Sequence, residues 1–164
     1  MRIIVVSDTH MPRRRVKGLP EQLNNALRDA DLILHAGDWC DMATVDALSP
    51  YAPLEGVAGN NDGEALIKRF GYRKIVTVGD VRIGIVHGHG VKGTTESRAR
   101  EAFARESPDV IVFGHSHIPL LKEMNGILLF NPGSPTDKRR QAKYSFGILE
   151  VDGRDIRASH LLFD

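Results

Sequence analysis

Residues that can bind metal ions stand directly after apolar runs in this sequence. The run 110–113, VIVF, ends at Gly114 and is followed by His115 and His117. Other apolar runs end in the same way, and the residues that follow them are Asp8, His10, Asp38, Asn60, Asn61, His87 and His89. Aspartate, histidine and asparagine side chains together form the mixed oxygen and nitrogen sites that suit divalent Mn, Fe, Ni or Zn. Because the set contains no thiolate, a cysteine-rich structural zinc site is excluded.

Each of these residues alone also has an ordinary structural explanation. An Asp or Asn after a strand commonly forms a turn or caps a helix, and a single histidine is more often a hydrogen-bonded polar residue than a ligand. However, five of the seven histidines fall in these motifs, and their joint occurrence favours a metal site. His35 and His160 lie outside the pattern and are predicted to be structural, while Trp39 and Cys40 are predicted to be packing residues.

The first half of the chain is predicted to alternate strands and helices. The apolar runs that indicate buried strands are 2–7, 31–37 and 52–59. Apolar residues at helical spacing predict a helix over 19–30, and a second, shorter helix is predicted between a cap at Asp41 and Pro50. This order is typical of a parallel sheet with right-handed crossovers.

The second half is predicted to consist mainly of hairpins. Their expected turns are Gly79-Asp80, Asn125-Gly126 and Asp152-Gly153. A helix near 94–106 and a buried strand over 108–114 complete the prediction. We expect an α/β fold with two sheets packed face to face and helices outside. Since ligands in open α/β sheets bind beyond the carboxyl ends of the strands, the polar residues at these ends should converge on one site.

Composition describes an ordinary globular chain of 164 residues, with 41% hydrophobic and 26% charged residues. The formal net charge of +1 implies no bulk attraction to nucleic acid or to anionic membranes. Cys40 is the sole cysteine, so no intrachain disulfide is possible and a reducing compartment fits. The N-terminal apolar run is too short for a signal peptide, and we therefore expect a cytoplasmic protein.

Six short motifs occur in a fixed order between residues 7 and 134, namely SDTH, HAGD, GNND, HGHG, GHSH and NPGS. This set resembles the calcineurin-like metallophosphoesterase superfamily, and in particular its small single-domain YfcE-type phosphodiesterase branch. The resemblance implies a four-layer αββα sandwich of two mixed β-sheets with outer helices, formed by residues 1–164 as one domain. It also implies two divalent metal ions per chain, with manganese the first choice and nickel, iron or zinc as alternatives.

The resemblance also assigns the metal ligands. One ion would be bound by Asp8, His10, Asp38 and His117, and the other by Asp38, Asn60, His87 and His115. Asp38 would bridge the two ions, as suits metals roughly 3.5–4 Å apart in hydrolytic sites. The implied activity is a metal-dependent phosphoesterase, more specifically a phosphodiesterase, in which the ions activate water for in-line attack on phosphorus.

One departure from the superfamily concerns Asn61, which stands where a histidine usually contacts the phosphate. An amide can donate a hydrogen bond but cannot act as a general acid near neutral pH. His89 is the candidate acid. An equal alternative is that His89 hydrogen-bonds to a metal ligand and orients it. The predicted catalytic residues are Asp38, Asn60 and His89, and the predicted substrate-binding residues are Asn61, Arg13 and Arg139.

Other functions of the same fold stay open. One is a protein-binding scaffold similar to the retromer subunit Vps29, which the complete ligand set argues against. Another is a nuclease, which the short chain does not favour. The expected partner is a small phosphodiester or phosphomonoester; a membrane is not expected, nucleic acid is not favoured, and a homo-oligomer is compatible with the sequence. NPGS is either a tight turn or a set of N–H groups that binds an anion or a ligating side chain.

Overall fold

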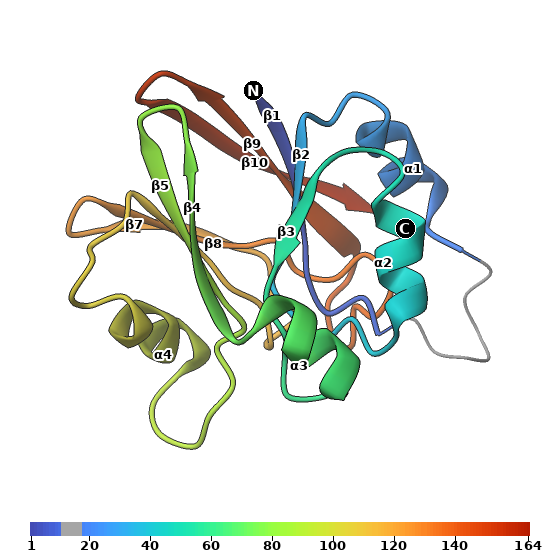
Figure 1. The fold of residues 1–164 in the computed structure, drawn as a ribbon, viewed down its shortest axis with the longest axis horizontal. Coiled ribbons are helices and arrows are strands. Elements are labelled where there is room, and N and C mark those ends of the chain that lie inside the picture. Colours follow the sequence, from blue (N-terminus) through green and yellow to red (C-terminus); the bar gives the residue numbers. More distant parts are fainter. Residues whose placement is uncertain (11–17) are drawn as a thin grey trace.

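The computed structural model describes residues 1–10 and 18–164, whose strands form two mixed sheets (Figure 1). The first sheet has the order β10 (Asp155–Phe163), β9 (Tyr144–Asp152), β1 (Arg2–Val6), β2 (Leu32–His35) and β3 (Leu54–Gly56). β1, β2 and β3 are parallel, as predicted, whereas β9 pairs antiparallel with both β1 and β10. The parallel strands therefore direct their carboxyl ends to one edge of this sheet.

The second sheet is built largely from hairpins. Its order is β4 (Arg73–Val78), β5 (Val81–Val86), β6 (Val110–Val112), β8 (Ile127–Asn131) and β7 (Leu120–Met124). β4 with β5 and β7 with β8 are antiparallel pairs, and β5, β6 and β8 run parallel. The turn residues of these hairpins are Gly79-Asp80 and Asn125-Gly126, as the sequence predicts.

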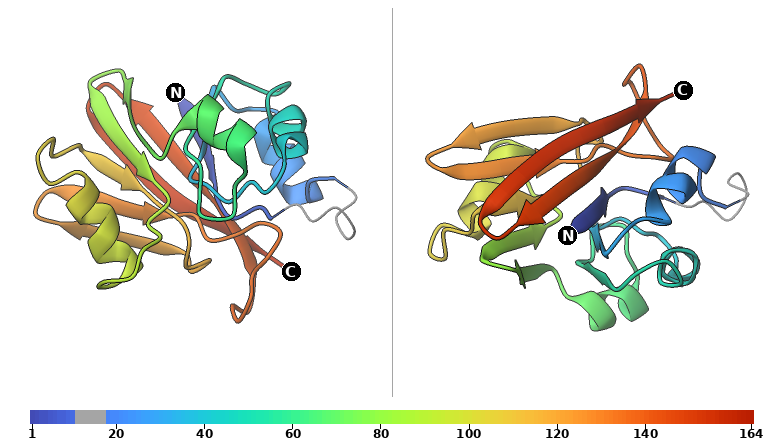
Figure 2. Two further views of the ribbon diagram at one scale, coloured as in Figure 1. Left: turned by 60° about the horizontal axis from the view of Figure 1, so that its bottom comes forward. Right: turned by 90° about the horizontal axis from the view of Figure 1, so that it is seen from above.

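The sheets pack face to face and share an apolar core that includes Ile3 and Leu34 from the first sheet and Ile83 and Val112 from the second. The helices are α1 (Glu21–Leu27), α2 (Met42–Leu48), α3 (Glu64–Phe70) and α4 (Thr95–Ala102). Apolar residues of α1, α2 and α3 pack with the outer face of the first sheet, and those of α4 with the second. The two further views in Figure 2 show these layers. The predicted αββα sandwich is confirmed.

The structure differs from the sequence prediction in two elements. The helix α3 was not predicted, although Glu64 in its first turn, Lys68 and Arg69 in its last turn and Gly71 after it are ordinary helix signals. The last hairpin turns at Gly153-Arg154 rather than Asp152-Gly153, because Asp152 still pairs with Asp155. In the part of the chain that the structure describes, no helix is long and apolar enough to cross a bilayer.

Candidate metal centre

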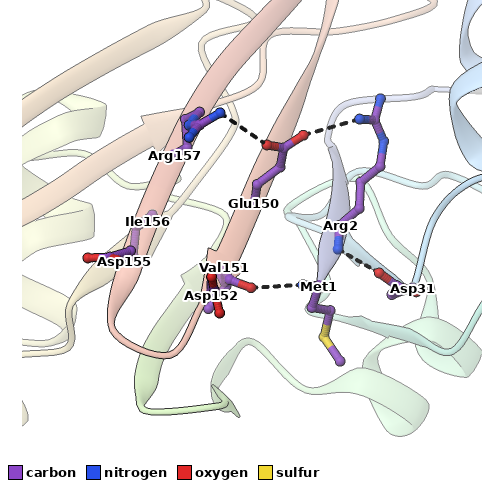
Figure 3. Close-up of a pocket in the computed structure, with 9 residues that line it drawn as sticks. All are labelled: Met1, Arg2, Asp31, Glu150, Val151, Asp152, Asp155, Ile156 and Arg157. Atoms are coloured by element: carbon purple, nitrogen blue, oxygen red, sulfur yellow. Dashed lines mark hydrogen bonds and ion pairs between the residues drawn. The ribbon is translucent and has the colours of Figure 1, made fainter.

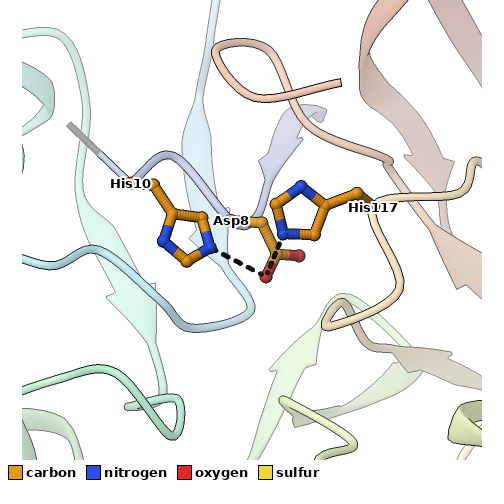
Figure 4. Close-up of side chains that lie close together, drawn as sticks. All are labelled: Asp8, His10 and His117. Carbon is orange, nitrogen blue, oxygen red and sulfur yellow. Dashed lines mark ion pairs between the residues drawn. The ribbon is translucent and has the colours of Figure 1, made fainter. Parts of the chain in front are cut away.

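Carboxylates and imidazoles from strand ends of both sheets converge at one place. Asp8 follows β1, Asp38 follows β2, His87 follows β5, and His117 follows β6. The ligand atoms of Asp8, His10 and His117 all lie within 4.8 Å of one another (Figure 4). Those of Asp8, Asp38 and His87 also lie within 4.8 Å of one another. Asp8 belongs to both groups, so these side chains form one continuous cluster, which we call the Asp–His cluster.

The imidazole Nε2 atoms all face carboxylate oxygens. The Nε2 of His87 lies 3.3 Å from Asp38 Oδ2 and 3.7 Å from Asp8 Oδ1. The Nε2 of His10 lies 3.4 and 3.8 Å from the same two oxygens, and that of His117 lies 3.5 Å from Asp8 Oδ1. These separations are longer than direct hydrogen bonds, and they leave space for an atom between the groups.

Several of these atoms are buried without a hydrogen-bonding partner. Within residues 1–10 and 18–164, this holds for Asp8 Oδ1 and for the Nε2 atoms of His10, His87 and His117. A buried polar atom without a partner costs free energy, and such atoms meeting at one point fit a bound cation. Since all are carboxylate oxygen or imidazole nitrogen, the residues present fit a divalent metal ion.

The opposite ring nitrogens fix the orientation of the imidazoles. His87 Nδ1 lies 2.8 Å from the carbonyl oxygen of Ala36, and His117 Nδ1 hydrogen-bonds with the carbonyl of Asp137. A carbonyl only accepts, so the proton lies on Nδ1 and the lone pair of Nε2 faces the cluster. His10 Nδ1 contacts the Cys40 thiol at 3.2 Å. This arrangement is typical of metal-binding histidines.

The carboxylate of Asp8 is held through one oxygen. Oδ2 accepts hydrogen bonds from the Ser7 hydroxyl at 2.8 Å and from the backbone N–H of His115 at 2.9 Å. Oδ1 is left to face the imidazoles. Burial raises the pKa of Asp8 to about 7, while the charge of His87 opposes this increase. A cation at the cluster would favour the ionised carboxylate.

Asp38 and His87 shift each other's pKa in opposite directions, and each favours the charged form of the other. Burial works against ionisation of Asp38, but nearby His87 and the donors of Asn61 hold its pKa below the ordinary value. Burial also works against protonation of His87, yet Asp38 and Asp8 raise its pKa above the ordinary value. The cluster thus attracts positive charge to the space between the carboxylates.

Most residues of these turns have a left-handed backbone. The φ angles are 54° at Asp8, 35° at His10, 58° at Asp38, 69° at His115 and 61° at His117. This conformation costs roughly 1–2 kcal/mol for a residue other than glycine. Such strain is concentrated at functional sites, where surrounding contacts impose it.

The remaining predicted residues lie on the open side of the cluster. The His115 ring is 5.2 Å from the His87 ring, and the His89 ring is 5.5 Å from it. Asn60 and Asn61 are exposed. The Asn61 amide and backbone N–H donate to the two oxygens of Asp38, each at 2.9 Å, so its side chain supports a predicted ligand.

The two predicted arginines are placed differently. Arg139 is exposed, with Nε 3.7 Å from Asp137 Oδ2. Burial is the main reason that the pKa values of His10 and His117 are lowered, and the charge of Arg139 contributes to both shifts. Arg139 is therefore near the cluster. Arg13 lies outside the described residues.

Sequence reasoning did not identify the side chains that hydrogen-bond to the backbone of the turns carrying the ligands. The NPGS motif does so through side chains: Asn131 Nδ2 donates to the Gly114 carbonyl at 3.0 Å, and the Ser134 hydroxyl donates to the Asp8 carbonyl at 2.8 Å. Asp62 accepts hydrogen bonds from the turn that carries Asp38. The available signal was the presence of the GNND and NPGS motifs themselves, but their partners are distant in sequence.

The histidines predicted to be structural are indeed engaged away from the cluster. His35 is fully buried, with Nδ1 accepting from the Gly37 N–H at 3.1 Å and Nε2 lying 3.0 Å from the Thr9 hydroxyl. His160 Nε2 lies 2.7 Å from the Asn131 carbonyl. Trp39 is buried and stacks on His35 with a centroid distance of 3.7 Å. Cys40 is more than a packing residue, because its thiol touches His10.

A separate pocket of about 700 Å³ lies at the opposite end of the first sheet (Figure 3). It is lined by Met1, Arg2, Asp31, Glu150, Val151, Asp152, Asp155, Ile156 and Arg157. Within it, Arg2 and Arg157 both pair with Glu150. The lining contains no imidazole, and we do not associate this pocket with the metal chemistry.

Two mixed sheets with an Asp–His cluster at their strand ends define an α/β protein with a metal-binding centre. The calcineurin-like phosphoesterase superfamily domain matches residues 1–154. A probable metallophosphoesterase from Methanothermobacter thermautotrophicus is 35% identical over 158 residues, covering 96% of this chain and 90% of the relative. Phosphodiesterase MJ0936 from Methanocaldococcus jannaschii is 26% identical over 145 residues, or 81% of this chain and 83% of that protein.

Solved structures show the same fold. Vps29 from Chaetomium thermophilum superposes with a TM-score of 0.81 at 22% identity, covering 99% of this chain and 98% of that one. This chain belongs to the calcineurin-like phosphoesterase superfamily. The Methanothermobacter relative is named a probable metallophosphoesterase, and within the described residues the Asp–His cluster holds the groups that could bind a metal ion.

Proposed function

We propose that this chain is a phosphodiesterase with a dinuclear metal centre. The observation that carries the proposal is the convergence of buried, unpartnered atoms: the Nε2 atoms of His10, His87 and His117 face carboxylate oxygens of Asp8 and Asp38. One cation cannot use all of these groups together with Asn60 and His115, so two ions are proposed. Asp38 is the proposed bridge, because its Oδ2 lies 3.4 Å from His10 Nε2 and 3.3 Å from His87 Nε2, which are assigned to different ions.

Each proposed ligand has a distinct place. His10, His117 and Asp8 form one ion's site, and His87, His115 and Asn60 form the other, with Asp38 common to both. When bound, two divalent ions would lower the pKa of a water molecule and neutralise the phosphoryl oxygens. Manganese is the first choice among ions suited to carboxylate and imidazole ligands, and nickel, iron and zinc are alternatives.

Groups on the open side would handle the substrate. Asn60 would orient the phosphate, and His89 would donate a proton to the leaving oxygen. Arg139 would attract the anion, and Asn61 would contact it or hold Asp38 in place. A phosphodiester is favoured over a monoester because one relative, MJ0936, is named a phosphodiesterase. Small phosphodiesters or phosphomonoesters are the proposed substrates, and the exposure of His89 and Asn60 fits an open site with loose substrate choice.

We also propose that residues 1–164 act as one domain. The apolar core between the sheets contains residues from both halves of the chain, and the cluster draws ligands from both sheets. Neither half holds the complete site. Urea unfolding followed by circular dichroism and by Trp39 fluorescence should therefore give coincident transitions.

A scaffold role is the second candidate, because the fold is similar to that of Vps29. The discriminating assay is hydrolysis of bis(p-nitrophenyl) phosphate with and without Mn²⁺, using wild type, Asp38→Asn and the distant control Asp109→Asn. We expect Mn²⁺-dependent activity in the wild type and the control. Absence of hydrolysis with any of Mn²⁺, Ni²⁺, Fe²⁺ or Zn²⁺ would reject the phosphodiesterase and favour the scaffold.

A further inference from the structure

Asp62 is a buried carboxylate at the end of the GNND motif, with 8% of its surface exposed. Its Oδ2 accepts hydrogen bonds from the backbone N–H groups of Asp38 at 2.9 Å and Gly59 at 2.7 Å. Its Oδ1 accepts from the N–H of Cys40 at 2.8 Å. Both oxygens are engaged by backbone donors, so Asp62 is not arranged as a metal ligand.

Two of these donors, the N–H groups of Asp38 and Cys40, come from a strained turn. Asp38 and Cys40 both have left-handed backbones, with φ of 58° and 72°. Successive N–H groups in such turns form a concavity that binds anions, and here the carboxylate of Asp62 occupies it. Hydrogen bonds to an ionised acceptor are roughly twice as strong as those between neutral groups. Asp62 therefore stabilises the conformation that presents Asp38.

The same carboxylate also draws the 59–62 turn against Asp38. A Cβ atom at Gly59 would lie 2.2 Å from Asp38 Oδ1 and 2.5 Å from the Asp38 backbone nitrogen, so a larger residue does not fit. In this position the backbone N–H and the amide of Asn61 donate to the two oxygens of Asp38. The orientation of the Asp38 carboxylate thus depends on this turn.

We infer that Asp62 is a positioning residue, which holds Asp38 in its metal-binding geometry and keeps the 59–62 turn, with the Asn61 donors, against it. The inference rests on the proposed function, because it takes Asp38 as a metal ligand. Asp62 acts on the metal through Asp38 and through the backbone of the two turns.

The test is titration of Mn²⁺ alone into the wild type, Asp62→Asn and Asp109→Asn. In Asp62→Asn one oxygen can still accept from Asp38 and Gly59, but the new NH₂ group faces the N–H of Cys40. Asp109 is an exposed control carboxylate that also accepts from a backbone N–H, that of Arg82 at 2.8 Å, away from the Asp–His cluster. Replacing groups that orient metal ligands typically lowers affinity about 10–100-fold. We expect a loss of this size for Asp62→Asn and wild-type affinity for Asp109→Asn.

A second readout separates metal positioning from general destabilisation. The rise in melting temperature on adding Mn²⁺ is measured from each variant's own metal-free value. It should be smaller for Asp62→Asn than for the wild type and Asp109→Asn. Equal rises, or equal affinities, would overturn the inference. If the wild type bound none of Mn²⁺, Ni²⁺, Fe²⁺ and Zn²⁺, the proposed function would fail and the inference with it, and that failure is visible without any variant.

Discussion

The Asp–His cluster has a buried side and an open side, and they differ in how firmly the side chains are held. On the buried side, Asp8, His87 and His117 are at most 1% exposed, and each is fixed by hydrogen bonds away from the cluster. On the open side, Asn60 and His89 are exposed. In the part of the chain that the structure describes, no hydrogen bond is seen at the ring nitrogens of His89 or His115.

This difference separates two tasks. The buried side is organised in advance, so an ion there meets ligands that are already oriented. The open side is free to exchange contacts between solvent, a second ion and a substrate. We expect a tightly bound ion near Asp8 and His117, and a more weakly bound one near Asn60 and His115.

Asp38 lies between the two sides, and its replacement should have the largest effect. In Asp38→Asn a neutral amide replaces the carboxylate that both ions would share. We expect at least about a 100-fold loss of diesterase activity, at the upper end of the losses seen when the surroundings of a metal are disturbed. Steady-state hydrolysis of bis(p-nitrophenyl) phosphate with saturating Mn²⁺ measures it, and a change of only a few fold would show that Asp38 does not bridge.

His89 tests the catalytic role of the open side. If it protonates the leaving group, His89→Ala should slow diesters with alkyl leaving groups by about 100-fold, the lower end of general acid catalysis. Nitrophenyl esters should change little, because nitrophenolate departs without a proton. A rate series across leaving-group pKa decides this, and equal losses for all esters would count against an acid role.

The lowered pKa of His89 predicts that the hydrolysis rate of alkyl diesters depends on pH. Burial and nearby positive charge lower the pKa of His89 below its ordinary value, so the protonated ring is scarce at neutral pH. Hydrolysis of alkyl diesters by the fully metallated enzyme should therefore rise as pH falls through the slightly acidic range, and this rise should be absent in His89→Ala. The pH profiles of the two proteins provide the measurement.

The two histidines of the GHSH motif allow a direct comparison of the two sides. His117 is buried and oriented by the Asp137 carbonyl, whereas His115 is partly exposed. We expect His117→Gln to weaken the tighter Mn²⁺ ion by about 10–100-fold, and His115→Gln to affect the weaker ion alone. Calorimetric titration resolves the two sites. If His115→Gln weakened the tighter ion and His117→Gln the weaker one, the division of the cluster into a buried and an open side would be contradicted.

Removing the tightly bound ion from the buried side should lower the melting temperature of the protein. A ligand that binds only the folded state at 100 times its Kd stabilises by about 2.7 kcal/mol. For a chain of this size that corresponds to about 5–10 °C in melting temperature. Scanning calorimetry with EDTA and with Mn²⁺ measures the shift, and an unchanged melting temperature would exclude tight binding at the buried side.

The smallest expected effect concerns Arg139 on the rim. Its side chain is 56% exposed, and exposed charge pairs are worth roughly 0.2–1 kcal/mol. Arg139→Ala should raise KM by about 1.5–5-fold with kcat unchanged, and the difference should shrink in high salt. A fall in kcat of similar size would place Arg139 at the reacting phosphate instead of the rim.

Much of the fold follows from local patterns in the sequence. Apolar runs indicate β1, β2 and β6, and the Asn125-Gly126 turn indicates the β7–β8 hairpin, because these signals depend on neighbouring residues. The cap at Asp41 is local in the same sense, with its carboxylate accepting from Ala43 N–H at 2.9 Å. The presence of candidate ligands after β1, β2, β3, β5 and β6 is likewise visible in the sequence.

Which ligands meet, and how they are oriented, was decided by the tertiary structure. His117 is oriented by a carbonyl 20 residues away and His87 by one 51 residues away. The contact of Cys40 with His10 spans 30 residues, and that of Asp62 with the Asp38 N–H spans 24. Residue type and spacing predict that imidazoles and carboxylates stand at strand ends. Only the packing of the two sheets decides which ring nitrogen of His87 and His117 carries the proton and which oxygen of Asp8 has no partner among the described residues. These features depend on hydrogen-bonding partners from other loops.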